Sequence, residues 1–154
     1  MTPYQVPGGY GDWEALLALI LDSFAYMDGV IDPPSSAHRL TPASMAQKAR
    51  DEHLYLVGAP PVACAFFRPE PDALYVGKLA VSPAYQRQGL GAALMAEGEA
   101  LARRLGLPKL RLETRVELTG NHAAFARMGF VKIAEKAHAG FDRATSITME
   151  KTLV

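Results

Sequence analysis

The feature that most constrains this chain is a glycine-containing segment between an apolar run and a long helical pattern. Ala73–Val81 is apolar and predicts a strand, and Leu90–Leu105 has the three- and four-residue apolar spacing of a helix. Between them Pro83 ends the strand because its ring removes a ladder donor, while Gly89 and Gly91 permit a tight turn. The segment therefore predicts a loop that brings backbone amides to the first turn of a helix.

Backbone amides at the start of a helix are ready donors to an anion. The first four N–H groups have no partner inside the helix, and the helix dipole places about half a positive charge there. Arg87 adds a full charge and a forked donor at the same place. We therefore expect this loop to hold a pyrophosphate.

The spacing of the glycines in the loop can be compared with the known phosphate-binding motifs. A P-loop needs a lysine directly after its last glycine, and none follows here. A dinucleotide fingerprint needs a small residue where Leu94 stands, and its first glycine normally lies hard against the strand end. Glu113 does lie about the right distance downstream for a ribose contact. A nucleotide-binding protein therefore remains an alternative.

Two segments resemble a known family. The pattern Gln-x-x-Gly-x-Gly at residues 86–91, a few residues beyond an extended strand, resembles the acetyl-CoA signature of the GNAT superfamily of N-acetyltransferases. Residues 121–130 are similar to the last motif of that family, a short helix that starts at Asn and ends in Gly-Phe. The resemblance covers nearly the whole chain and is most specific between Leu79 and Phe130.

The pattern of the whole chain fits the same family. The order is strand, two helices, three strands, helix, strand, helix and two strands. It implies an α+β fold, an α/β/α sandwich with a mixed, mostly antiparallel sheet of six to seven strands and about four helices, splayed at the cofactor cleft. The expected strands are residues 3–7, 53–57, 62–67, 73–81, 110–116, 131–135 and 146–153, and the expected helices follow Asp12 and span 41–50, 90–105 and 121–128.

The resemblance implies a way of holding acetyl-CoA. In the family, the pantetheine arm pairs like an added strand with the strand before the phosphate loop. The cofactor-binding set that this implies is Leu79, Ala80, Val81, Gln86, Arg87, Gln88, Gly89, Leu90, Gly91, Ala92, Asn121 and Phe125. Asn121 is expected to be the N-cap of its helix and also a contact to the pantetheine or pyrophosphate region.

The resemblance also implies catalytic roles, with one departure. An amide near Leu79 would face the thioester oxygen, and such a donor is typically worth about 10²–10³ in rate. Glu113 is the candidate base, although its strand also fits a simple solvated face, and His138 is a second candidate for moving a proton. Where many members of the family place a tyrosine that protonates the leaving thiolate, this chain has Phe125.

These residues predict an enzyme that moves an acetyl group from acetyl-CoA to a primary amine of an unidentified small molecule or peptide. The amine would attack the thioester directly, since no Ser-His-Asp or activated Cys arrangement indicates an acyl-enzyme. The alternative, motivated by Phe125, is a CoA-binding or sensor module on the same scaffold with catalysis weak or lost.

Length and composition set the remaining expectations. A chain of 154 residues predicts one domain, 1–154, and its 16 basic and 16 acidic side chains cancel, which argues against nucleic acid or an anionic membrane as a partner. The single cysteine, Cys64, is expected to be buried and inert, and the histidines have no metal-ligand spacing. We expect a cytoplasmic protein without a metal, whose partners are acetyl-CoA and an amine, and, as in many similar proteins, a homodimer.

Overall fold

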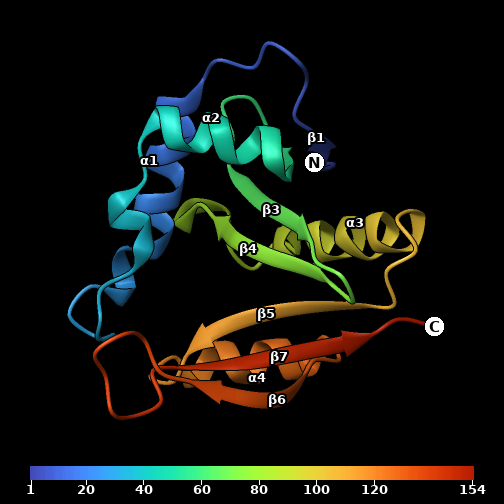
Figure 1. Ribbon diagram of the computed structural model, residues 1–154. Helices are drawn as coiled ribbons and strands as arrows, with labels where there is room; N and C mark the ends of the chain where they lie inside the picture. The colour runs from blue at the N-terminus through green and yellow to red at the C-terminus, as the bar shows by residue number, and fades with distance from the viewer.

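The computed structural model describes residues Met1–Val154 and contains one seven-stranded sheet (Figure 1). Its strand order is β1-β2-β3-β4-β5-β7-β6, and every neighbouring pair is antiparallel except β4 and β5. The strands are β1 (Tyr4–Gln5), β2 (His53–Val57), β3 (Ala63–Pro69), β4 (Leu74–Val81), β5 (Lys109–Arg115), β6 (Val131–Lys136) and β7 (Ser146–Thr152).

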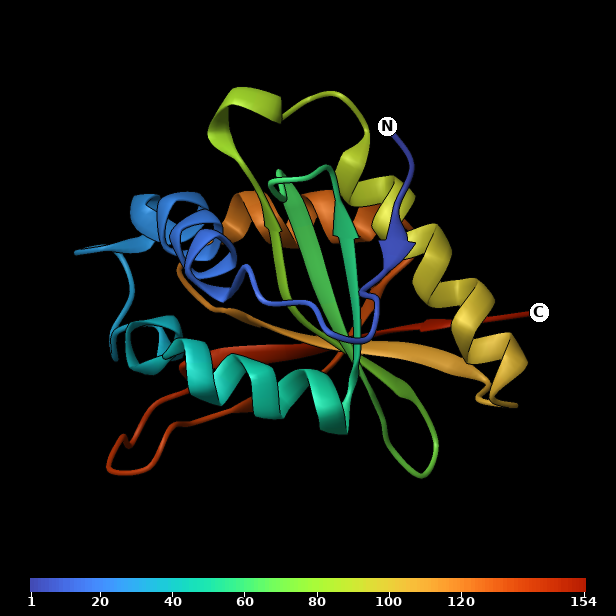
Figure 2. The same cartoon turned by 90° about the horizontal axis from the view of Figure 1, so that it is seen from above.

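Helices cover both faces of this sheet, as Figures 1 and 2 show. Along β2, Leu54 and Leu56 pack with α1 and α2 in one core, while Tyr55 and Val57 pack with α3 in the other. This alternation is the two-residue period of a strand that is buried on both faces. The helices are α1 (Trp13–Phe24), α2 (Pro42–Asp51), α3 (Leu90–Arg104) and α4 (Thr119–Arg127), and short 3-10 turns occupy Ala25–Met27, Ser36–Arg39 and Pro83–Tyr85.

The sheet opens between β4 and β5. These strands pair in parallel only where they begin, through Leu74 with Leu110 and Tyr75 with Arg111. Further along, β5 stays paired with β7 as far as Arg115, whereas β4 from Val76 to Val81 has no strand on that side. The predicted α+β fold with a splayed sheet is therefore confirmed.

A bulge distorts β4 on its other side. The register with β3 shifts between Cys64, which pairs with Ala80, and Phe66, which pairs with Gly77. Lys78 therefore belongs to the extra length of β4, and its φ of 49° lies in the left-handed region that non-glycine residues seldom enter. The bulge therefore bends β4 locally, beside the opening.

Some boundaries differ from those predicted. Of the expected strand 3–7, Tyr4–Gln5 forms β1, and the Val6 N–H also donates to the Leu54 carbonyl at 2.9 Å. The helix from Leu90 ends at Arg104 rather than Leu105, and Asp12 precedes α1 without a capping side-chain hydrogen bond. Gly98 faces the sheet so closely that a Cβ there would lie 2.6 Å from Phe67 Cε1, which explains a glycine within α3.

Candidate active site

Two cavities meet at the open edge of β4. The first, of about 530 Å³, is called the charged cavity here because five cationic side chains line it. The second, of about 630 Å³, is called the loop cavity because it lies beside residues 83–91. The residues that line both cavities are Phe24, Tyr26, Leu79, Asn121 and Phe125. The cavities therefore share a wall at the point where β4 separates from β5.

The loop after β4 has the predicted form. Arg87 and Gly89 have φ values of 65° and 79°, and Gly89 is the N-cap of α3 without a side-chain cap. Ala93 N–H bonds to the Gly89 carbonyl, but the three amides before it, at 90–92, have no acceptor within the chain. A Cβ at Gly91 would meet no atom within 4 Å, so the space beside these amides is open.

The structure brings together part of the predicted cofactor-binding set. Ala80 and Leu90 are buried in the two cores, so their side chains face away from the cavities. Arg87, Gln88, Gly89 and Ala92 are exposed beside the loop cavity but do not line it. The predicted residues that do line the loop cavity are Leu79, Val81, Gln86, Gly91, Asn121 and Phe125.

The backbone of Val81 is already engaged within the chain. Its N–H donates to Ser23 Oγ at 3.1 Å, and its carbonyl accepts from Gln86 Nε2 at 3.3 Å. Ser23 is buried in α1, at a position where the helical pattern of leucines gave no sign of a buried hydroxyl. Ala80 pairs with Cys64 in the ladder between β3 and β4. Of the three residues expected to hold a pantetheine arm, only Leu79, in the bulge, has no ladder partner.

The N-cap role predicted for Asn121 is wrong. Helix α4 begins earlier, at Thr119, and Leu118 occupies the N-cap position without a side-chain cap. Because Asn121 lies inside the first turn, its side chain is free to point outward, and Nδ2 donates to Tyr26 Oη at 3.0 Å. Asn121 thus links α4 to the segment after α1, across the opening in the sheet.

Phe125 closes the shared wall from the side of α4. Its ring packs edge-on against Phe130, with 5.9 Å between the ring centroids. No hydroxyl is present at this position, although the side chain reaches both cavities. An acid for a leaving group would have to come from another residue or from water.

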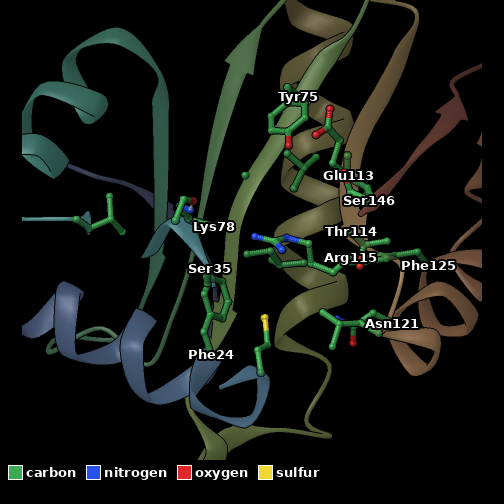
Figure 3. Close-up of a pocket in the computed structure, with 18 of the residues that line it drawn as sticks. Phe24, Ser35, Tyr75, Lys78, Glu113, Thr114, Arg115, Asn121, Phe125 and Ser146 are labelled. Atoms are coloured by element: carbon green, nitrogen blue, oxygen red, sulfur yellow. Dashed lines mark hydrogen bonds between the residues drawn. The ribbon is translucent and has the colours of Figure 1, made fainter. Parts of the chain in front are cut away.

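The two proton-transfer candidates both line the charged cavity. Glu113 lies on the β5 side (Figure 3), where Oε2 accepts from Lys136 Nζ at 2.8 Å. His138 comes from the segment between β6 and β7, and its Nδ1 is hydrogen-bonded to Thr145 Oγ1. Beside Glu113, burial raises the pKa of Tyr75 to about 12, and the Glu113 charge adds to the shift. The Tyr75 hydroxyl therefore remains protonated at neutral pH.

Lys78 is a cavity residue that the sequence pattern did not single out. It lies in the bulge of β4, on the wall opposite Glu113 in Figure 3, and its Nζ donates to Ser36 Oγ. Burial lowers its pKa to about 8, and the positive charges of Lys48, Arg39 and Arg115 add to the shift. Only the strand register could have revealed it, because one lysine in an apolar strand carries no motif.

The connection between α1 and α2 closes one side of the charged cavity. Arg115, at the end of β5, donates from its guanidinium to the carbonyls of Pro33 and Pro34. Glu117 Oε2 accepts from the Asp32 N–H at 3.2 Å. These hydrogen bonds hold the segment between α1 and α2 against the end of β5, on the far side of the opening.

Comparison with known proteins identifies the family. A model of the acetyltransferase (GNAT) family matches residues 13–130, and the chain belongs to this family. No curated protein sequence matches the chain.

No helix has the length and apolar character needed to cross a membrane. No group of three or more His, Cys, Asp or Glu side chains converges as a metal site requires.

Solved structures show the same fold at low identity. A GNAT-family acetyltransferase from Staphylococcus aureus Mu50 is 12% identical with a TM-score of 0.76, and the match covers 99% of each chain. The ribosomal-protein-S18-alanine N-acetyltransferase from Escherichia coli is 19% identical with a TM-score of 0.70, over 98% of this chain and 92% of that one. A GNAT-family acetyltransferase from Elizabethkingia anophelis with acetyl-CoA bound is 18% identical with a TM-score of 0.67, over 99% and 97%.

Proposed function

We propose that the protein transfers an acetyl group from acetyl-CoA to a primary amine within a ternary complex. The observation that carries this proposal is the meeting of two cavities at one wall, next to a loop with free amides. The loop cavity would take the cofactor, the charged cavity would take the amine, and Leu79 lies between them.

The chain offers donors for each part of the cofactor. The free amides at 90–92 and the Arg87 guanidinium would bind the pyrophosphate. The unpaired edge of β4 would take the pantetheine arm as an added strand, which is a general mode of peptide-like recognition. The Leu79 amide would then face the thioester oxygen, and Asn121 and Phe125 would flank the arm.

Elementary pKa values decide which proton matters most. A thiol of pKa near 8.5 leaves as a thiolate about 2 kcal/mol above its protonated form at pH 7. An alkylammonium of pKa near 10.4 costs about 4.6 kcal/mol to deprotonate at that pH. A base therefore contributes more than an acid, so the absence of a hydroxyl at Phe125 is tolerable. We assign the base to Glu113, with His138 as a second path for the proton.

A CoA-binding module without catalysis remains the second candidate, favoured by Phe125 alone. A nucleotide-binding protein has no support from the fold, because the dinucleotide-binding architecture needs a mostly parallel sheet. Only β4 and β5 are parallel here, over two residue pairs.

The proposal is tested by mixing the protein with acetyl-CoA and a panel of amines and following free thiol. Turnover with any amine supports the enzyme, whereas tight CoA binding by calorimetry without turnover supports the module. Gly91→Val should weaken acetyl-CoA binding by at least about tenfold, because the new side chain enters the loop cavity rather than the core. Undiminished binding by this variant would overturn the assignment of the cofactor site.

A matched control exists in α4. Gly120 is also a helical glycine whose Cβ would meet no atom within 4 Å, but it lines neither cavity. Gly120→Val should therefore leave the affinity for acetyl-CoA unchanged. The thermal midpoints of both variants show whether either substitution has disturbed the fold.

A further inference from the structure

The charged cavity has an excess of positive charge that the whole chain does not have. The chain carries 16 basic and 16 acidic side chains. Within the lining, by contrast, Glu113 is the only carboxylate. The cationic side chains in the lining are Arg39, Lys48, Arg68, Lys78 and Arg115. An imbalance confined to one cavity suggests a ligand of opposite charge.

Three of these cations are already committed to partners. Lys48 pairs with Glu52 at 2.8 Å, and Arg68 pairs with Glu70 at 2.9 Å. Arg115 donates to two backbone carbonyls of the connection between α1 and α2. The lone carboxylate of the cavity, Glu113, is itself paired with a lysine at 2.8 Å. None of these groups therefore neutralises the charge of the two remaining cations, Arg39 and Lys78.

Arg39 and Lys78 have no carboxylate partner. Arg39 is an exposed residue at the end of the turn Ser36–Arg39, and its guanidinium forms no salt bridge within the chain. Lys78 uses one of its three ammonium donors on Ser36 Oγ and forms no salt bridge. Both side chains line the same cavity, and the charge of Arg39 acts on Lys78.

The surroundings of Lys78 are electrostatically unfavourable while the cavity contains no anion. Burial and the charges of Lys48, Arg39 and Arg115 all oppose its positive form, and Glu52 alone among its stronger neighbours favours that form. The nearby Arg68, Glu113 and His138 also face this cavity, but none of them pairs with Lys78. A bound anion would relieve this repulsion.

We propose that the acceptor is a small amine that also carries an anionic group, and that Arg39 and Lys78 hold this group in the charged cavity. This inference rests on the proposed acetyl transfer, and it names the chemical class of the acceptor. Amino acids and amines with a phosphonate fit it. Polyamines do not, because their extra ammonium groups would meet these same cations.

The test compares acceptors that differ only in the second group. An ω-amino acid, the aminoalkyl phosphonate and the diamine of the same length have similar amines at one end. We expect kcat/KM to be at least about tenfold higher for the acids than for the diamine. The ratio between the carboxylate and the phosphonate shows which anion fits. A preference for the diamine would overturn the inference while leaving acetyl transfer itself established.

Variants show whether these two residues cause the preference. Arg39→Gln and Lys78→Met should each raise KM for the acid about tenfold, with little change in kcat and no loss with the diamine. Arg50→Gln removes an exposed cation of α2 outside both cavities and should leave both acceptors unchanged. Equal losses for acid and diamine in the first two variants would contradict the assignment.

A binding measurement keeps the inference testable if no amine is acetylated. The N-acetylated ω-amino acid is titrated into the CoA-loaded protein by calorimetry, with the mono-N-acetylated diamine as the cationic control. Binding of the acid to the wild type and its loss in Arg39→Gln would support the anion site even if acetyl transfer failed. Absence of binding in the wild type would overturn it.

Discussion

At the end where β4 and β5 begin, Arg111 is surrounded by carboxylates, whereas at the end where they separate Arg39 and Lys78 have none. Arg111 donates to Glu150 at 2.7 Å, to Glu70 at 2.8 Å and to Asp72 at 2.8 Å. These contacts raise its pKa, with the hydrogen bond that Arg111 donates to Asp72 as the largest cause. At the open end, the pKa of Lys78 falls instead.

The difference separates charges that hold the fold from charges available to a ligand. A cation whose donors are all satisfied by the chain contributes to stability and has little left for a ligand. A partly buried cation without a carboxylate is costly in the free protein, and a ligand anion can recover that cost. The two ends of one strand pair should therefore respond oppositely to loss of charge.

The largest effect is expected at the closed end. Arg111→Met leaves the buried Glu150 and its neighbours Glu70 and Asp72 without their shared cation, although Lys109 still lies 3.1 Å from Glu150. We expect a loss of about 2 kcal/mol in the free energy of unfolding, reduced from the value for a fully buried pair by partial solvation. Chemical denaturation measures it, and calorimetry should find the affinity for acetyl-CoA unchanged. An unchanged free energy of unfolding in Arg111→Met would contradict the proposed difference between the paired and the open ends of β4 and β5.

A smaller effect of opposite sign is expected at the open end. Lys78→Met should stabilise the protein by about 1 kcal/mol at pH 7, since it removes a partly buried, repelled charge. Because the folded pKa is about 8 and the ordinary value is 10.5, the unfolded chain binds more protons between these pH values. Wild-type stability should therefore rise relative to the variant from pH 8 to pH 10.5. A difference that is constant across this range, in denaturation at several pH values, would contradict the assigned pKa.

Phe125→Tyr sharpens the comparison by adding a hydroxyl to the shared wall. We expect a rise in kcat of a few-fold, worth less than about 1 kcal/mol, because the thiolate needs little help to leave. The rise should be largest for the poorest thiol leaving groups, which steady-state rates with acyl-CoA analogues would reveal. A large loss of rate would show instead that the ring itself is required for packing at this wall.

The smallest effect is expected for Arg39→Gln on stability. Because Arg39 is exposed and unpaired, its loss should change the free energy of unfolding by no more than about 0.5 kcal/mol. Arg50→Gln serves as the comparison on α2. A larger loss at Arg39 in denaturant titration would place it among the charges that hold the fold.

The elements that follow from local patterning were predictable. The alternation along β5 places Leu110, Leu112 and Thr114 inside, and the glycine loop leads into α3 as expected. Cys64 is fully buried, as predicted, and burial raises the pKa of its thiol to about 12. In each case the signal lies within a few neighbouring residues.

The features that depend on distant contacts were not predictable. The bulge that presents Lys78 arises from the register between β3 and β4, which no local pattern encodes. The bond between Ser23 and Val81 joins residues 58 positions apart. Asn121 was misassigned because a good N-cap residue type also fits the first turn, where it bonds to Tyr26. The candidate site is therefore less evident in the sequence than the fold.

The bond from Asn121 to Tyr26 has a mechanical consequence. Beyond the first two residue pairs of β4 and β5, no backbone ladder sets the width of the opening, and side-chain contacts such as this one span it instead. A neutral hydrogen bond of this kind is worth only about 0.5–1.5 kcal/mol. Breaking this one hydrogen bond would let the opening widen around an incoming molecule, while the backbone pairing on either side of the opening stays intact.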